Sequence, residues 1–138
     1  MSRTLQFVKK YPLSLLCIAL VWYLSIWFMP PKELKLPSIN FMDKWTHLVM
    51  YGGTCCVIWI EYLRQHQRPN AMQLFLWAWL APILMGGLIE IVQEHCTATR
   101  SGEWLDFAAD ATGCTLAVGI GLLMKNAMKN VKMKKCNN

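Results

Sequence analysis

The sequence predicts an all-α, polytopic membrane protein, built as a four-transmembrane-helix bundle with short loops. Of its 138 residues, 55% are hydrophobic and only 16% are charged. The hydrophobic residues gather in blocks instead of recurring on one face of a helix, which is typical of membrane-spanning segments. No separate soluble domain can be placed between these blocks, so we expect a single transmembrane domain over residues 1–138.

Four apolar blocks have about the length of a membrane span. A helix needs about 20 residues to cross a hydrocarbon core of about 30 Å, and flanking amphipathic residues extend a slightly shorter block. The first block ends in Trp27-Phe28-Met29-Pro30-Pro31, an aromatic interface followed by helix breakers, as in a retained span. The predicted spans cover about 12–29, 45–62, 73–92 and 105–124, and a basic cytoplasmic tail covers 125–138.

The basic residues predict which way the bundle faces. With both termini in the cytoplasm, ten lysines and arginines lie on the inner side and four on the outer side. This distribution follows the positive-inside tendency, and the opposite orientation would invert it. The net charge is +6, but no basic and aromatic pattern of a nucleic-acid-binding module is present. We therefore expect membrane lipids, and not nucleic acid, as partners.

Three polar stretches, at 43–47, 90–94 and 100–110, adjoin or enter the apolar blocks. In the predicted orientation all three lie at the outer face, because the second and fourth spans begin there and the third ends there. Polar side chains at membrane depth are costly unless they are paired, so they usually mark a functional site. The candidate polar pocket comprises Asp43, Lys44, His47, Tyr51, Glu90, Gln93, Arg100, Asp106 and Asp110.

Helical spacing places several of these residues on shared faces. Asp106 and Asp110 lie one turn apart, and like charges at about 6 Å repel by roughly 3 kcal/mol at an effective dielectric constant of about 20. At least one of these acids should therefore be protonated or paired with a base. Asp43 and His47 also have plainer interpretations, as a helix cap and an interhelical hydrogen-bond partner. Small residues should allow close helix packing at Gly86, Gly87, Gly113 and Gly121.

Six cysteines, at positions 17, 55, 56, 96, 114 and 136, contain no Cys-x-x-Cys pair. A disulfide framework or zinc site is not expected, and the cysteines are interpreted as small packing residues. No other metal-ligand spacing stands out, and no cofactor motif is present. The sequence therefore predicts neither a metal nor a cofactor.

The polar residues also carry a resemblance to a known family. The motifs resemble those of the VanZ-like family in order, spacing and placement on the spans: Asp43-Lys44-x-x-His47 before Tyr51, Gly87-x-x-Glu90-x-x-Gln93, Arg100, and Asp106-x-x-Ala109-Asp110-x-x-Gly113. The match covers the second to fourth spans, about two-thirds of the chain. In the family's Asp-x-x-x-Asn pattern this chain has Asp110, a titratable acid, where an asparagine is usual.

The resemblance implies a small protein of the bacterial inner membrane, whose family's founding member raises resistance to the glycopeptide teicoplanin. A first hypothesis is therefore a pocket in the outer leaflet that binds a lipid-linked or lipidated ligand. The alternative is an intramembrane enzyme acting on an envelope lipid or its head group, with His47 or Asp110 as base and Arg100 with Lys44 as phosphate partners. Ion conduction is disfavoured because Glu61 stands nearly alone toward the inside. The ligand, any turnover and the oligomeric state stay open.

Overall fold

A computed structural model describes residues 3–27, 42–66, 68–96 and 102–136, and every regular element among them is a helix. The all-α prediction is confirmed. The elements in chain order are α1 (Arg3–Lys10), α2 (Pro12–Ile26), α3 (Met42–Gln65), α4 (Ala71–Phe75), the π-helical stretch η1 (Leu76–Leu80), α5 (Ala81–Cys96) and α6 (Trp104–Cys136).

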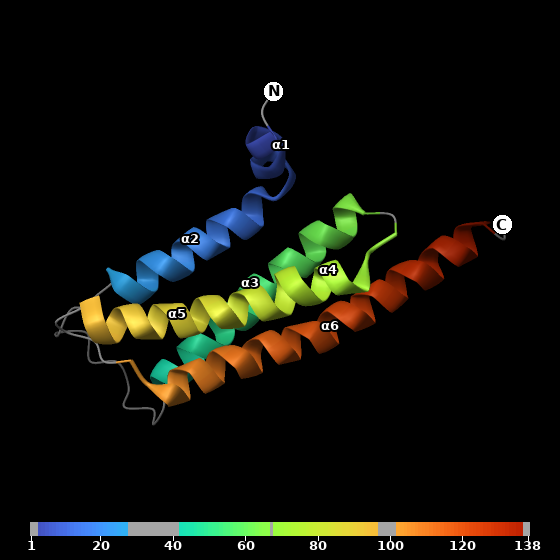
Figure 1. Cartoon of the computed structure of the whole chain (residues 1–138). Helices are drawn as coiled ribbons and strands as arrows, with labels where there is room; N and C mark the ends of the chain where they lie inside the picture. The colour runs from blue at the N-terminus through green and yellow to red at the C-terminus, as the bar shows by residue number, and fades with distance from the viewer. Residues whose placement is uncertain (1–2, 28–41, 67, 97–101, 137–138) are drawn as a thin grey trace.

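The long helices alternate in direction. Figure 1 shows α2, α3, α5 and α6 lying lengthwise together, so that α2 and α5 end where α3 and α6 begin. The most extensive packing joins α3 and α6. At the opposite end of the bundle lie α1, the end of α3 and the start of α4 (Figure 1).

A break at Tyr11 separates α1 from α2, and the sequence did not predict a separate helix over residues 3–10. Pro12 has no backbone N–H and disfavours helical geometry in the residue before it, and Tyr11 has φ −131° and ψ 52°. Glu61 of α3 then caps the new helix. Its buried carboxylate accepts hydrogen bonds from the backbone N–H groups of Leu13 (3.0 Å) and Ser14 (2.8 Å) and from the Ser14 hydroxyl (2.6 Å). This acid therefore joins the start of α2 to α3.

The segment from α4 to α5 is one helical rod with a local change of pitch. The sequence predicts a kink or tight packing near Pro82, because proline removes one donor from the helix. The structure places the π-helical stretch η1 immediately before it, where the Ala81 N–H donates to the Leu76 carbonyl five residues earlier. Such a π-bulge accommodates the irregularity without ending the helix.

Two helical stretches, Ala71–Cys96 and Trp104–Val131, are long and apolar enough to cross a membrane. With 15 residues, α2 is only about 22 Å long, and α3 has 24 residues but is less apolar. Spans at 12–29 and 45–62 therefore stay predictions. Of the predicted span at 12–29, the structure describes residues 12–27. Helix α6 continues into the predicted basic tail and ends at Cys136.

The buried core is small, and much of the apolar surface faces outward. Tyr51, Cys55, Ile89 and Cys114 are fully buried between α3, α5 and α6. By contrast, large hydrophobic side chains are exposed on every long helix, and only 28% of the apolar 18-residue window in each candidate span is buried within the protein. Helices that are apolar but mostly unburied are typical of segments that face lipid or another apolar partner.

Candidate functional site

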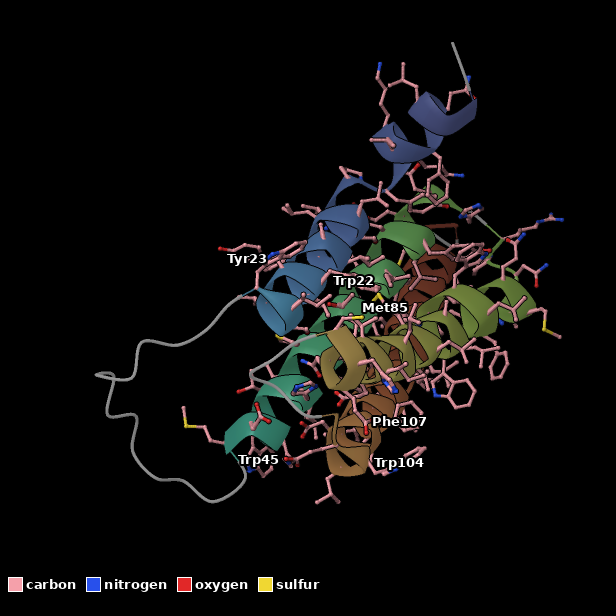
Figure 2. All side chains as sticks on the ribbon, turned by 60° about the vertical axis from the view of Figure 1, so that its left-hand side comes forward. Trp22, Tyr23, Trp45, Met85, Trp104 and Phe107 are labelled. Atoms are coloured by element: carbon pink, nitrogen blue, oxygen red, sulfur yellow. The ribbon has the colours of Figure 1, made fainter. Side chains whose placement is uncertain are left out.

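The three polar stretches converge at one end of the bundle. Helix α5 is antiparallel to α3 and α6. Its polar last turns therefore lie beside the first turns of these two helices (Figure 1). Figure 2 shows Trp45 and Trp104 at this same end, and both side chains are exposed. Exposed tryptophans near charged residues are typical of the boundary between membrane and water.

The deepest part of the cluster is built around His47. Its Nδ1 lies 3.0 Å from Asp110 Oδ1 and 4.0 Å from Glu90 Oε1. His47 is 3% exposed, Glu90 7% and Asp110 0%, so all three are withdrawn from water. At this distance a hydrogen bond joins His47 Nδ1 to Asp110 Oδ1. One nitrogen is thus approached by two acids from two different helices.

A layer of charged residues covers this core toward the end of the bundle. Lys44 Nζ lies 2.9 Å from Asp106 Oδ1, donates to Glu103 Oε2, and lies 3.9 Å from Asp43 Oδ2. Hydrogen bonds to Asp106 and Glu103 hold the pKa of Lys44, which is outside the predicted span, above its usual range. Lys44 therefore stays a cation and offsets the charge of the surrounding acids.

Glu90 also fixes the start of α6. Its second oxygen, Oε2, accepts a hydrogen bond of 2.9 Å from the backbone N–H of Glu103, the residue just before α6. The chain passes so close to α5 here that a Cβ on Gly102 would lie 2.5 Å from the Glu90 carbonyl oxygen. The position thus requires glycine. Glu103 lies in the polar stretch 100–110 but was not among the expected pocket residues, because its partner Lys44 lies 59 residues away.

Two other expected pocket residues have different surroundings. Tyr51 is fully buried and stacks on His47 with ring centroids 6.3 Å apart, and its hydroxyl has no hydrogen-bond partner among the residues that the structure describes. Gln93 donates from Nε2 to the Ser25 carbonyl at 2.8 Å, which joins α5 to α2. Arg100 lies outside the described residues.

The four expected packing glycines all lie against a neighbouring helix. A Cβ on Gly86 would approach Asp110 Oδ2 to 2.6 Å, and one on Gly87 would lie 3.3 Å from the Phe107 ring. A Cβ on Gly113 would overlap the Leu48 carbonyl, and one on Gly121 would overlap the Trp59 ring. Close approach at Gly86 and Gly113 therefore brings α3, α5 and α6 together beside Asp110.

Two groups of side chains have the ligand types of a metal site: Asp43, His47 and Asp106, and the fully buried His47, Glu90 and Asp110. The ligand atoms in each group lie within 4.8 Å of one another. A Zn²⁺ or Mg²⁺ ion about 2.1 Å from each ligand requires ligand atoms no more than about 4.2 Å apart, and the His47 Nδ1 distances to Asp110 Oδ1 (3.0 Å) and Glu90 Oε1 (4.0 Å) meet this requirement. Without a metal ion, two acids that face one His47 nitrogen can share a proton with it.

Apart from Arg100, which lies outside the described residues, the motifs that resemble the VanZ-like family therefore lie together in space. Their acidic and basic members on α3, α5 and α6 contribute most of the buried charge at this end of the bundle. No protein-family model, curated protein or solved structure matches the chain, and the likeness to the VanZ-like family accordingly stays a prediction from these motifs.

Proposed function

We propose that the chain is a four-span protein of the bacterial inner membrane, with both termini in the cytoplasm and the polar cluster toward the outer leaflet. Two helices that are apolar enough to span, and the exposed apolar side chains along the bundle, support the membrane location. The excess of basic residues at the other end supports the orientation. The short α2 would cross by locally thinning the bilayer.

The function we propose is binding of a lipid-linked or lipidated ligand at the polar cluster. The observation that carries this proposal is the group His47, Glu90 and Asp110, buried at one end of a helical bundle whose outer surface is apolar. Buried charges contribute little to stability, so their presence at this depth favours a functional role. The resemblance to the VanZ-like family suggests teicoplanin, whose acyl chain suits a site at the membrane edge.

Expression in a teicoplanin-susceptible bacterium tests this function. Wild-type protein should lower sensitivity to teicoplanin more than sensitivity to vancomycin, which lacks the acyl chain. His47→Ala should abolish the difference, whereas His95→Ala, which alters an exposed histidine on α5, should preserve it. Equal protection against both antibiotics, or no protection while the protein is present in the membrane, would contradict the proposal.

A second candidate function is an intramembrane enzyme acting on an envelope lipid or its head group. The His47 and Asp110 pair at 3.0 Å favours it, because such a pair can take up and release a proton. In this alternative, Arg100 and Lys44 would bind a phosphate. Lipid profiles of cells that express wild-type protein, His47→Ala or Asp106→Asn test turnover. Identical profiles for all three would argue against it.

A further inference from the structure

A cavity lies at the end of the bundle opposite the polar cluster. It has a volume of about 370 Å³ and is bounded by α1 and α2, the last turns of α3, and the rod from α4 to η1. Figure 1 shows these elements together at the end where α3 gives way to α4. The volume lies within the range of small-molecule sites. The polar cluster contributes no residue to this cavity.

The lining of the cavity is apolar toward the middle of the bundle and basic at the end of the bundle. Ile18 and Ile58 lie about two turns inside the bundle from the start of α2 and the end of α3, and Trp77 faces the cavity from η1. Lys10 and His66 line it at the ends of their helices. The cavity therefore has an apolar interior and a basic rim, as expected of a site for an amphiphile.

The rim carries an uncompensated positive charge. His66 Nδ1 lies 3.1 Å from the Tyr62 carbonyl, which only accepts, so Nδ1 bears the proton and Nε2 is free to accept from Lys10 Nζ at 3.4 Å. Among the residues that the structure describes, no carboxylate lies within 4 Å of Lys10 Nζ. The nearby acid Glu61 is already occupied by the start of α2.

We propose that this cavity binds an anionic membrane phospholipid, with an acyl chain along Ile18, Ile58 and Trp77 and the phosphate on Lys10. The proposal shares the membrane location proposed above but is independent of the polar cluster. A phosphate oxygen would take the place of a carboxylate as the charged acceptor for Lys10. A basic rim on the cytoplasmic side would also meet the leaflet that carries anionic lipids.

Native mass spectrometry of the whole chain in detergent tests the proposal. The probe is an equimolar mixture of phosphatidylglycerol and phosphatidylcholine with identical acyl chains. Both lipids carry a phosphate, but the choline of phosphatidylcholine adds a cation beside Lys10, so wild-type protein should carry about ten-fold more of the anionic lipid. Lys10→Met should reduce the preference to about two-fold or less. Lys9→Met, which removes the adjacent charge outside the cavity lining, should preserve it.

Two further measurements distinguish binding of the acyl chain from binding of the head group. Ile58→Trp, which fills the cavity, should remove both lipids, whereas inorganic phosphate alone should displace neither. Equal binding of the two lipids to wild-type protein would overturn the proposal without any variant. An equal loss of preference in Lys9→Met and Lys10→Met, or displacement of the lipid by phosphate alone, would also overturn it. As the folding control, each variant should unfold in detergent at the same midpoint temperature as the wild-type protein.

Discussion

Replacing Gly113 by alanine tests the contact that holds α3 against α6. A Cβ at this position would overlap the Leu48 carbonyl oxygen and lie 3.0 Å from the Gly52 nitrogen, so backbone rather than a flexible side chain blocks it. The two helices would have to separate by about 1 Å to restore ordinary contact distances. Gly119 lies on the same helix, and a Cβ there would meet nothing within 4 Å. Gly119→Ala is therefore the matched control.

The two substitutions should change the free energy of unfolding in opposite directions. Replacing a glycine inside a helix by alanine stabilises the helix by about 0.5–1 kcal/mol, so Gly119→Ala should be neutral or slightly stabilising. Overpacking costs about 1–3 kcal/mol, and the loss of close backbone contact adds to it at Gly113. We expect Gly113→Ala to be less stable by about 2 kcal/mol, which corresponds to roughly 5–10 °C in the unfolding midpoint.

A thiol-reactive fluorogenic maleimide can follow this unfolding in detergent. Cys55 and Cys114 are fully buried between α3 and α6, so they react only when these helices part. Gly113→Ala should lower the temperature at which they become reactive, and Gly119→Ala should not. Equal midpoints for the two variants would refute the close approach of α3 and α6.

Three other predictions concern buried polar contacts, each read from thermal unfolding in detergent. Glu61→Gln should destabilise by about 1–2 kcal/mol, because it weakens the cap of α2, whereas Glu94→Gln at an exposed site should change stability by less than about 0.5 kcal/mol. A double-mutant cycle of His47→Ala with Asp110→Ala should give a coupling energy of about 1–3 kcal/mol, and additive effects would contradict the pair. Lys44→Met should destabilise by about 1–3 kcal/mol and Lys44→Arg by less, because arginine keeps the charge; equal losses would exclude an ionic role.

The sequence predicted the helices better than their ends. Apolar blocks and breaking prolines locate the four long helices, because these features depend on neighbouring residues. The separate helix α1 was missed, since a single pre-proline residue, Tyr11, makes the break. The cap supplied by Glu61 was also missed. Its partners are 47 and 48 residues away, and only the unpaired N–H groups at the start of α2 hinted at the need for an acceptor.

The site was predictable as a region but not as a set of contacts. Alternating helix direction places the three polar stretches at one end, which follows from chain order alone. Which acid contacts His47 depends on the rotation of each helix about its axis, and that is decided by the close approaches at Gly52, Gly86 and Gly113. Glycine patterns indicate that helices pack closely but not which helix each one meets.

The central claim is that the polar cluster lies at the outer face of a membrane-spanning bundle, and cysteine labelling of intact cells tests it most directly. In a chain whose native cysteines are replaced, Asp43→Cys and Gln65→Cys place single thiols at the two ends of α3, where both positions are exposed. A membrane-impermeant maleimide should label the thiol at position 43 in intact cells, and the thiol at 65 only after lysis. Labelling of 65 but not 43 in intact cells, or equal labelling of both, would contradict the account.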